Sequence, residues 1–473
     1  MTHRLFVLIG PVAMGAALLA GCSMAPAYHV PASVQPTPAF RADPGWAQAN
    51  PADDVAKGAW WRLFGDATLD ALEARVLVTN QNLAYYRAAY AQALATARVD
   101  RAALLPVIGA SAGVTHGGKV SGNGAATSTF TATGTASWTP DLWGALSNTQ
   151  RAATASAESS AAQLANATLS AQGTLATNYF ALRGLDAQAQ MLDDTLVSYR
   201  RSLVITMNKH AAGTVSSADV DTARTTLANA EASRRDLARL RVAYEAAIAV
   251  LVGENPGTFA LAPAPWQPVV PQVPGVVPSA VLERRPDIAG AERQVAAANA
   301  TIGVQRAAFF PSVGLTASLG SNAGAIGNLF GAATSLWSLG ASAAETLIDW
   351  GARSARVAGA RAAYDATVAT YRQTVLTAFQ EVETDLAALD GYRAEHEQYD
   401  TAAQSAVRAE TVTRNAYQAG TVDFTSVTSA QALAYSARAN LIQNTVNQQT
   451  AAVALIQAIG GQWSGPVDLH PAR

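Results

Sequence analysis

The sequence contains few cysteine, histidine or aromatic residues. Its single cysteine among 473 residues excludes a disulfide framework and any cysteine-rich metal site. The six histidines are scattered and none is paired at metal-ligand spacing, so we expect neither a metal nor a diffusible cofactor. A formal net charge of −2 gives no electrostatic reason to expect nucleic acid as a partner.

Alanine dominates the composition. It fills 106 positions, and hydrophobic residues make up 50% of the chain while charged residues make up only 14%. Alanine is the best helix former and allows close packing, so long and closely spaced helices are expected. This composition disfavours an ordinary soluble enzyme.

The amino terminus has the pattern of a secretory signal. A short polar start with Arg4 precedes an apolar stretch that ends in Leu19-Ala20-Gly21-Cys22. This segment resembles a bacterial lipoprotein signal, which implies a signal peptide over 1–21 and a covalent lipid on Cys22. Ser23 after the cysteine implies sorting to the outer membrane, where the acyl chains would insert into lipid. The alternative is a chance thiol in an ordinary signal peptide. Residues 22–59 are rich in proline and alanine and are expected to form a tether.

The rest of the chain contains two copies of one pattern. Ala212-Gly213-Thr214-Val215 recurs unchanged as Ala419-Gly420-Thr421-Val422, 207 residues later, and Trp143-Gly144 recurs at the same offset. We therefore expect repeat 1 over 60–253, a proline-rich linker over 254–282, repeat 2 over 283–463 and a short tail over 464–473.

Each repeat is expected to contain a helix, two strands, a very long helix, a tight turn and a further helix. Residues alternate between apolar and small polar types in four segments, which predicts strands. These segments are 108–114, 129–138, 312–319 and 337–343. Helical patterns cover 69–104 and then 143–210 and 350–418, so that the long helices reach about 100 Å at ~1.5 Å per residue. The fold class is therefore mainly α with β. An apolar stripe at spacings of three and four residues predicts a packing seam along the segment 350–418. It consists of Tyr364, Val368, Tyr371, Val375, Phe379, Val382, Leu386 and Leu389.

The four strands predict an oligomeric pore. Strands of about ten residues with one apolar and one Ser/Thr/Gly face are typical of a membrane β-barrel, and barrels need at least about eight strands. Four strands cannot close alone, because their edges would leave backbone groups unpaired in hydrocarbon. Several chains must then share one transmembrane barrel, and the helices are expected to continue it as a helical barrel. The alternatives are that the chain is a soluble coiled-coil protein, or that the strands are edge strands of a soluble β-sandwich.

The chain resembles the TolC-family outer-membrane factors, specifically the NodT-like lipoprotein branch of tripartite efflux systems, from Trp60 to Trp463. The motifs that carry the resemblance are Trp60-Trp61-Arg62-Leu63-Phe64-Gly65-Asp66, Leu105-Pro106, Asp141-Leu142-Trp143-Gly144, Glu283-Arg284-Arg285-Pro286-Asp287-Ile288, Phe310-Pro311, Asp349-Trp350-Gly351 and the two Ala-Gly-Thr-Val turns. The resemblance implies a homotrimer in the outer membrane with a periplasmic helical tunnel. It also implies a periplasmic adaptor protein and an inner-membrane transporter of the resistance-nodulation-division (RND) type as partners. The chain would then be a passive exit duct for drugs or other small toxic compounds.

The resemblance also indicates where to look for functional residues. The closed end of the duct is expected just after the helix turns, where the candidate gate residues are Asp219, Asp221, Asp423, Thr425, Ser426 and Ser429. The three acids are expected to give the mouth a negative field, or else simply to cap helix starts. The candidate adaptor contacts are the turn residues Gly213, Thr214, Val215, Gly420, Thr421 and Val422, whose alternative role is turn geometry alone.

Two other functions fit the same pattern. One is the exit channel of a type I protein-secretion system, and the other is a lipid-anchored structural coiled coil without a pore. An enzymatic function is not expected. Residues 109–113 match the G-x-S-x-G nucleophile pattern, but they lie in an alternating strand and not in a strand-to-helix turn.

Overall fold

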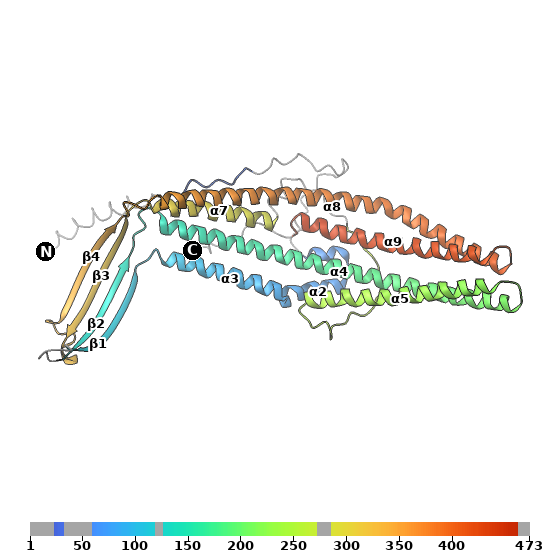
Figure 1. The fold of residues 1–473 in the computed structure, drawn as a ribbon, viewed down its shortest axis with the longest axis horizontal. Coiled ribbons are helices and arrows are strands. Elements are labelled where there is room, and N and C mark those ends of the chain that lie inside the picture. Colours follow the sequence, from blue (N-terminus) through green and yellow to red (C-terminus); the bar gives the residue numbers. More distant parts are fainter. Residues whose placement is uncertain (1–22, 33–58, 119–125, 272–284, 462–473) are drawn as a thin grey trace.

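The computed structural model of the protein describes residues 23–32, 59–118, 126–271 and 285–461. The described chain is long and narrow, with a four-stranded sheet at one end and two helical turns at the other (Figure 1). The expected signal peptide and Cys22 lie outside the described residues.

The two repeats have helices of the same lengths. Within each repeat the three main helices have 22, 67 and 35 residues. They are α3 (Gln81–Ala102), α4 (Ala145–Ala211) and α5 (Ser217–Leu251), followed by α7 (Pro286–Ala307), α8 (Ala352–Gln418) and α9 (Phe424–Ala458). This match confirms the repetition and the two very long helices expected from the sequence.

The four expected strands form one antiparallel sheet. Their order is β1 (Val107–Gly117), β2 (Thr127–Trp138), β3 (Ser312–Ala323) and β4 (Ser335–Ala344). A short 3₁₀ helix, η2 (Ile326–Asn328), lies between β3 and β4. The central pairing, β2 with β3, joins the two repeats.

The helix expected over 69–104 is two helices, which corrects the sequence-based prediction. It divides into α2 (Ala67–Thr79) and α3 at Asn80, whose backbone is extended. The Asn80 side chain accepts a hydrogen bond from the amide of Leu83 at 3.0 Å and so caps α3. Its amide group also donates to the carbonyl of Leu251 at 2.7 Å, at the end of α5. Asparagine competes with the helix for backbone hydrogen bonds, and here this competition ends α2.

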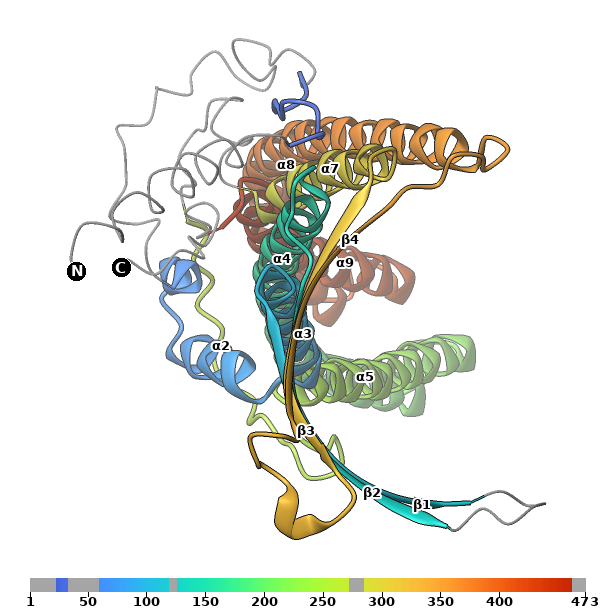
Figure 2. The same ribbon diagram turned by 90° about the vertical axis from the view of Figure 1, so that its left-hand side faces the viewer.

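The helices form a curved wall. The helix α4 contacts α3 and α5 on one side and α7 and α9 on the other, and α8 packs against α7 and α9. The end-on view shows α2 on the convex side of this wall (Figure 2). There, η1 (Trp60–Phe64) and α2 pack onto α4, and the hydroxyl of Tyr179 donates to the carboxylate of Asp66 at 2.6 Å.

The predicted seam of α8 lies in the main hydrophobic core. Its members Val368, Tyr371, Val375, Val382, Leu386 and Leu389 are buried, while Tyr364 and Phe379 pack against the same cluster partly buried. The same core contains Leu175, Tyr179 and Phe180 of α4. One continuous core therefore joins the two repeats.

Candidate functional site: sheet faces, sheet edges and helix turns

The strand register places like residues in rows across the sheet. One row consists of Ile108, Ala136, Ala317 and Leu339. The next row, on the opposite face, consists of Gly109, Thr135, Ser318 and Ser338. The apolar face is open: Ile108 is 83% exposed, and Trp337 and Leu339 are each 75% exposed. One apolar and one small polar face, as expected from the sequence, suit a boundary between lipid and water.

The two outer strands have unpaired edges. The sheet order leaves β1 and β4 each with a single neighbour in the described chain. Their outer N–H and C=O groups need partners, since unpaired backbone groups are costly in a bilayer. A second sheet with the same two edges can supply those partners.

The junction between sheet and helices is fixed by tryptophans. The indole of Trp143 donates to the carbonyl of Pro311 at 2.7 Å and stacks on Phe310 at a centroid distance of 4.8 Å. The indole of Trp138 donates to the carbonyl of Leu104 at 3.0 Å. Each contact joins the end of a strand to a helix end, and the amphipathic ring suits a membrane–water interface. The sequence shows the motifs Leu105-Pro106 and Phe310-Pro311, but it does not show that the two tryptophans contact the chain at or beside these motifs.

The two turns at the far end share one hydrogen-bond pattern. Gly213 and Gly420 have φ of +73° and +81°, which only glycine adopts readily. The hydroxyl and amide of Thr214 both bond to the carbonyl of Lys209, and Thr421 bonds to the carbonyl of Ala416 in the same way. Glycine and threonine therefore have geometric roles here, while their exposure leaves them open to a partner. Adaptor contact at these turns stays a prediction.

The candidate gate acids lie at helix starts. Asp219 forms a capping box with Ser216, and the side chain of Asp423 accepts the amide of Ser426 at 2.8 Å. The hydroxyl and the amide of Ser426 lower the pKa of Asp423. Asp221 pairs with Arg224 at 3.3 Å. The capping role that we stated as the alternative is thus present for Asp219 and Asp423, and a negative mouth stays a prediction.

Thr425, Ser426 and Ser429 are exposed on the first turns of α9. The ends of α4 and α8 contact each other close to the two turns. The ammonium group of Lys209 donates to the carbonyl of Tyr417 and lies 4.1 Å from the centre of its ring. The sequence contained no signal for this contact, because the two residues are 208 positions apart.

The described part of the expected tether lies against the protein. The side chain of Asn299 donates to the carbonyl of Pro26 at 3.0 Å, and the hydroxyl of Tyr28 bonds to Glu292. At Gly303 an added Cβ would lie 2.6 Å from the Cβ of Ala25, so α7 leaves room for this segment. Residues 23–32 therefore form an ordered strap, which we call the N-terminal strap.

Comparison with known proteins agrees with this geometry. The model of the family "Outer membrane efflux protein" matches residues 72–254 and 277–461. The chain belongs to this family. It is 31% identical over 418 residues to the pyoverdine export outer membrane protein OpmQ of Pseudomonas aeruginosa, covering 85% of this chain and 87% of OpmQ. It is 30% identical over 468 residues to the probable efflux pump outer membrane protein TtgC of Pseudomonas putida, covering 96% and 95%.

Solved structures show the same fold. The Campylobacter jejuni CmeC outer membrane channel superposes with a TM-score of 0.86 at 23% identity, covering 93% of this chain and 95% of CmeC. The outer-membrane channel OprN superposes with a TM-score of 0.83 at 26% identity, covering 94% and 100%. The chain is accordingly an outer-membrane efflux channel protein, and the family is one of transport proteins and not of enzymes. Across its described residues, no helix is sufficiently long and apolar to span a bilayer.

Proposed function

We propose that three copies of the chain close one duct through the outer membrane. The observation that carries this proposal is the sheet with two unpaired edges, because β4 of one copy can pair with β1 of the next. The helical wall also has open flanks with exposed apolar residues, namely Val99 at 68%, Val242 at 62% and Val412 at 67%. Closure in a trimer would give twelve strands, within the range known for membrane barrels.

The duct is proposed to act passively within a tripartite efflux pump. A periplasmic adaptor would contact the turns at Gly213–Val215 and Gly420–Val422, and an RND-type inner-membrane transporter would supply the energy. The names of the relatives span export of pyoverdine, toluene efflux and cation efflux. We therefore propose small toxic compounds as the substrates. The resemblance of Leu19–Cys22 to a lipoprotein signal supports an acyl anchor on Cys22, from which the N-terminal strap leads onto α7.

The proposal is tested with the full-length protein. Native mass spectrometry in detergent should give a trimer, and planar bilayers should show single-channel conductance. A stable monomer without conductance would contradict the duct and favour the structural coiled coil. Deletion of the gene should sensitise cells to toxic compounds, whereas loss of one secreted protein with unchanged sensitivity would favour type I secretion.

The acyl anchor has a separate test. Labelled palmitate should be incorporated into the wild type and not into Cys22→Ser, which removes the only thiol in the chain. Labelling of both proteins, or of neither, would contradict an anchor at this residue. The conductance test is independent of this result.

A further inference from the structure

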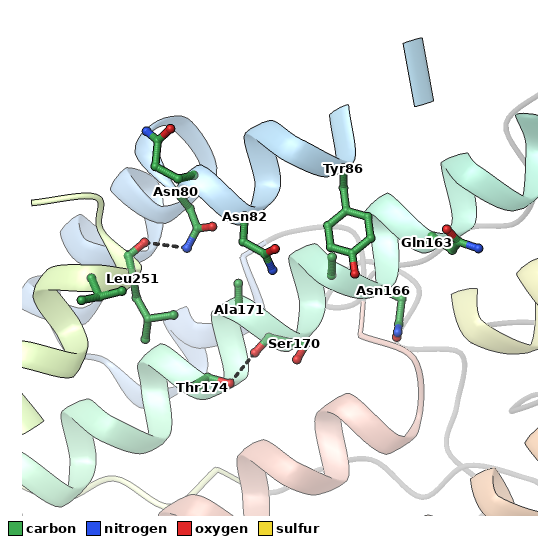
Figure 3. Close-up of a pocket in the computed structure, with 12 residues that line it drawn as sticks. Asn80, Asn82, Tyr86, Gln163, Asn166, Ser170, Ala171, Thr174 and Leu251 are labelled. Carbon is green, nitrogen blue, oxygen red and sulfur yellow. Dashed lines mark hydrogen bonds between the residues drawn. The ribbon is translucent and has the colours of Figure 1, made fainter. Parts of the chain in front are cut away.

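A pocket lined by uncharged side chains lies halfway along the helical wall, on α4. It has a volume of about 460 Å³, within the range of small-molecule sites. The close-up shows its lining side chains, which come from the start of α3, the end of α5 and one face of α4 (Figure 3). We propose that this pocket binds an uncharged, hydroxyl-rich solute, such as a sugar, during its passage through the duct.

The pocket lies where the first residues of α3 meet the last residues of α5 on the surface of α4. The side chain of Asn80 joins these two helix ends through its bond to the carbonyl of Leu251. At Gly253, just beyond α5, an added Cβ would lie 2.4 Å from the carbonyl oxygen of Thr79, so the end of α5 approaches the end of α2 very closely. These contacts make the pocket part of the folded chain, with no need for a ligand to form it.

The chemistry of the lining selects a neutral ligand. None of the lining residues is charged. Asn82, Tyr86, Gln163 and Asn166 line the pocket, and within the described chain no hydrogen bond engages their side-chain polar groups. Amides offer both donors and acceptors, which the hydroxyl groups of a sugar match. An apolar ligand would leave those groups unpaired, and an ionic ligand would find no counter-charge among the residues that line this pocket. The charged side chains of Arg285 and Asp287 line a neighbouring hollow, which shares Asn166 and Ser170 with this pocket.

The pocket faces the concave side of the wall. Ser170 lines the pocket, and Tyr179 bonds to Asp66 beside α2 on the convex side. Tyr179 follows Ser170 by nine positions, which is about 2.5 helical turns at ~3.6 residues per turn, so the two side chains point in opposite directions. The concave side becomes the lumen only if the trimer closes, and in that respect the inference rests on the proposed function. The pocket itself belongs to one chain.

The second repeat has an equivalent pocket with different chemistry. Its lining includes Asp287, Gln373 and Thr377, at the repeat positions of Asn82, Asn166 and Ser170, and its volume is about 530 Å³. Here Asp287 is engaged by Arg285 at 2.7 Å, and the side chain of Gln373 donates to Thr377 at 3.3 Å. The repetition produces the hollow in both halves, but only in the first repeat do the side chains at these positions have no hydrogen-bond partner in the described chain.

The test is saturation-transfer difference NMR of maltotriose with the full-length protein in dodecyldimethylamine oxide, a detergent without sugar groups. The wild type should give saturable signals. The variant Asn82→Ala/Asn166→Ala should raise the Kd about tenfold or more, because it removes two sets of hydrogen bonds. Gln373→Ala, at the equivalent position of the second repeat, should leave the Kd unchanged. Circular dichroism checks that each variant folds, and the exposed single change Gln163→Ala should still weaken binding if the double variant does not fold.

Absence of maltotriose signals from the wild type would overturn the inference, as would equal Kd values for the wild type and the Asn82→Ala/Asn166→Ala variant. An equal loss in Gln373→Ala would refute the assignment to the first repeat. Binding does not require a conducting pore. Conductance without binding would therefore refute only the site, while binding without trimers or conductance would refute only the proposed duct.

Discussion

Two glycines at equivalent repeat positions should respond to the same substitution with opposite signs. Gly184 lies in α4 and Gly391 lies 207 residues later in α8. A Cβ at Gly184 would lie 2.4 Å from a methyl group of Val446 in α9, whereas a Cβ at Gly391 would have no neighbour within 4 Å. In the first repeat glycine permits two helices to approach, and in the second it only weakens the helix.

The magnitudes follow from this difference. Gly391→Ala should stabilise the protein by up to about 1 kcal/mol, the difference in helix propensity. Gly184→Ala gains the same amount but overlaps a β-branched side chain that cannot rotate freely. Overpacking costs about 1–3 kcal/mol, and an overlap so far inside the contact distance of ~3.5–4.0 Å belongs in the upper half of that range. We therefore expect a net destabilisation of about 1–2 kcal/mol.

Thermal melting followed by circular dichroism in detergent measures both variants against the wild type. Gly391→Ala should melt higher and Gly184→Ala lower. Val446→Ala should restore part of the stability when it is combined with Gly184→Ala, and this non-additivity identifies the overlap as the cause. Equal stabilisation by both alanines would show that α4 and α9 do not approach at this position, and would refute the reasoning.

Four further predictions concern buried and interhelical polar groups. Arg285→Ala should destabilise by about 1–3 kcal/mol, because it removes a buried guanidinium and leaves the buried carbonyl of Ala458 without its donor. Asn80→Ala should destabilise by about 1–2 kcal/mol in the same melting assay. Burial, followed by repulsion from a nearby aspartate, raises the pKa of Glu73 from 4.5 to about 9, so its contribution to stability is intact below pH 4.5 and is lost as the pH rises toward 9. Glu73→Gln should therefore raise the melting temperature at pH 8 and not at pH 4, and an equal shift at both would contradict it. Lys209→Met should speed hydrogen exchange at the turns by loosening the contact with Tyr417, and an unchanged rate would show that this contact is not stabilising.

The sequence predicted those features that are repetitive or periodic. The Ala-Gly-Thr-Val turns fixed the offset of 207, and the alternation of small polar with apolar residues located all four strands. It did not predict the break at Asn80, because one asparagine within an alanine-rich helical pattern is tolerated unless a distant partner engages it. That partner, the carbonyl of Leu251, lies 171 residues away. The strap was missed for the same reason, since a proline-rich segment has no periodicity and its order depends on contacts with α7.

The two repeats also show how one backbone geometry accommodates two chemistries. Asn80 directly precedes α3, and Arg285 directly precedes α7. Each donates to the carbonyl of the last residue of the 35-residue helix in its own repeat. The bond from Asn80 to Leu251 is 2.7 Å long, and the bond from Arg285 to Ala458 is 2.9 Å long. An amide can make this bond without a counter-ion, but a buried guanidinium requires carboxylates, which Asp287 and Glu381 provide. The two pockets differ accordingly in their lining, which is uncharged in the first repeat and includes Asp287 in the second. In the first repeat the donor is neutral, and the amides of Asn82 and Asn166 have no hydrogen-bond partner in the described chain. In the second repeat Arg285 pairs with Asp287, and the side chain of Gln373 donates to Thr377.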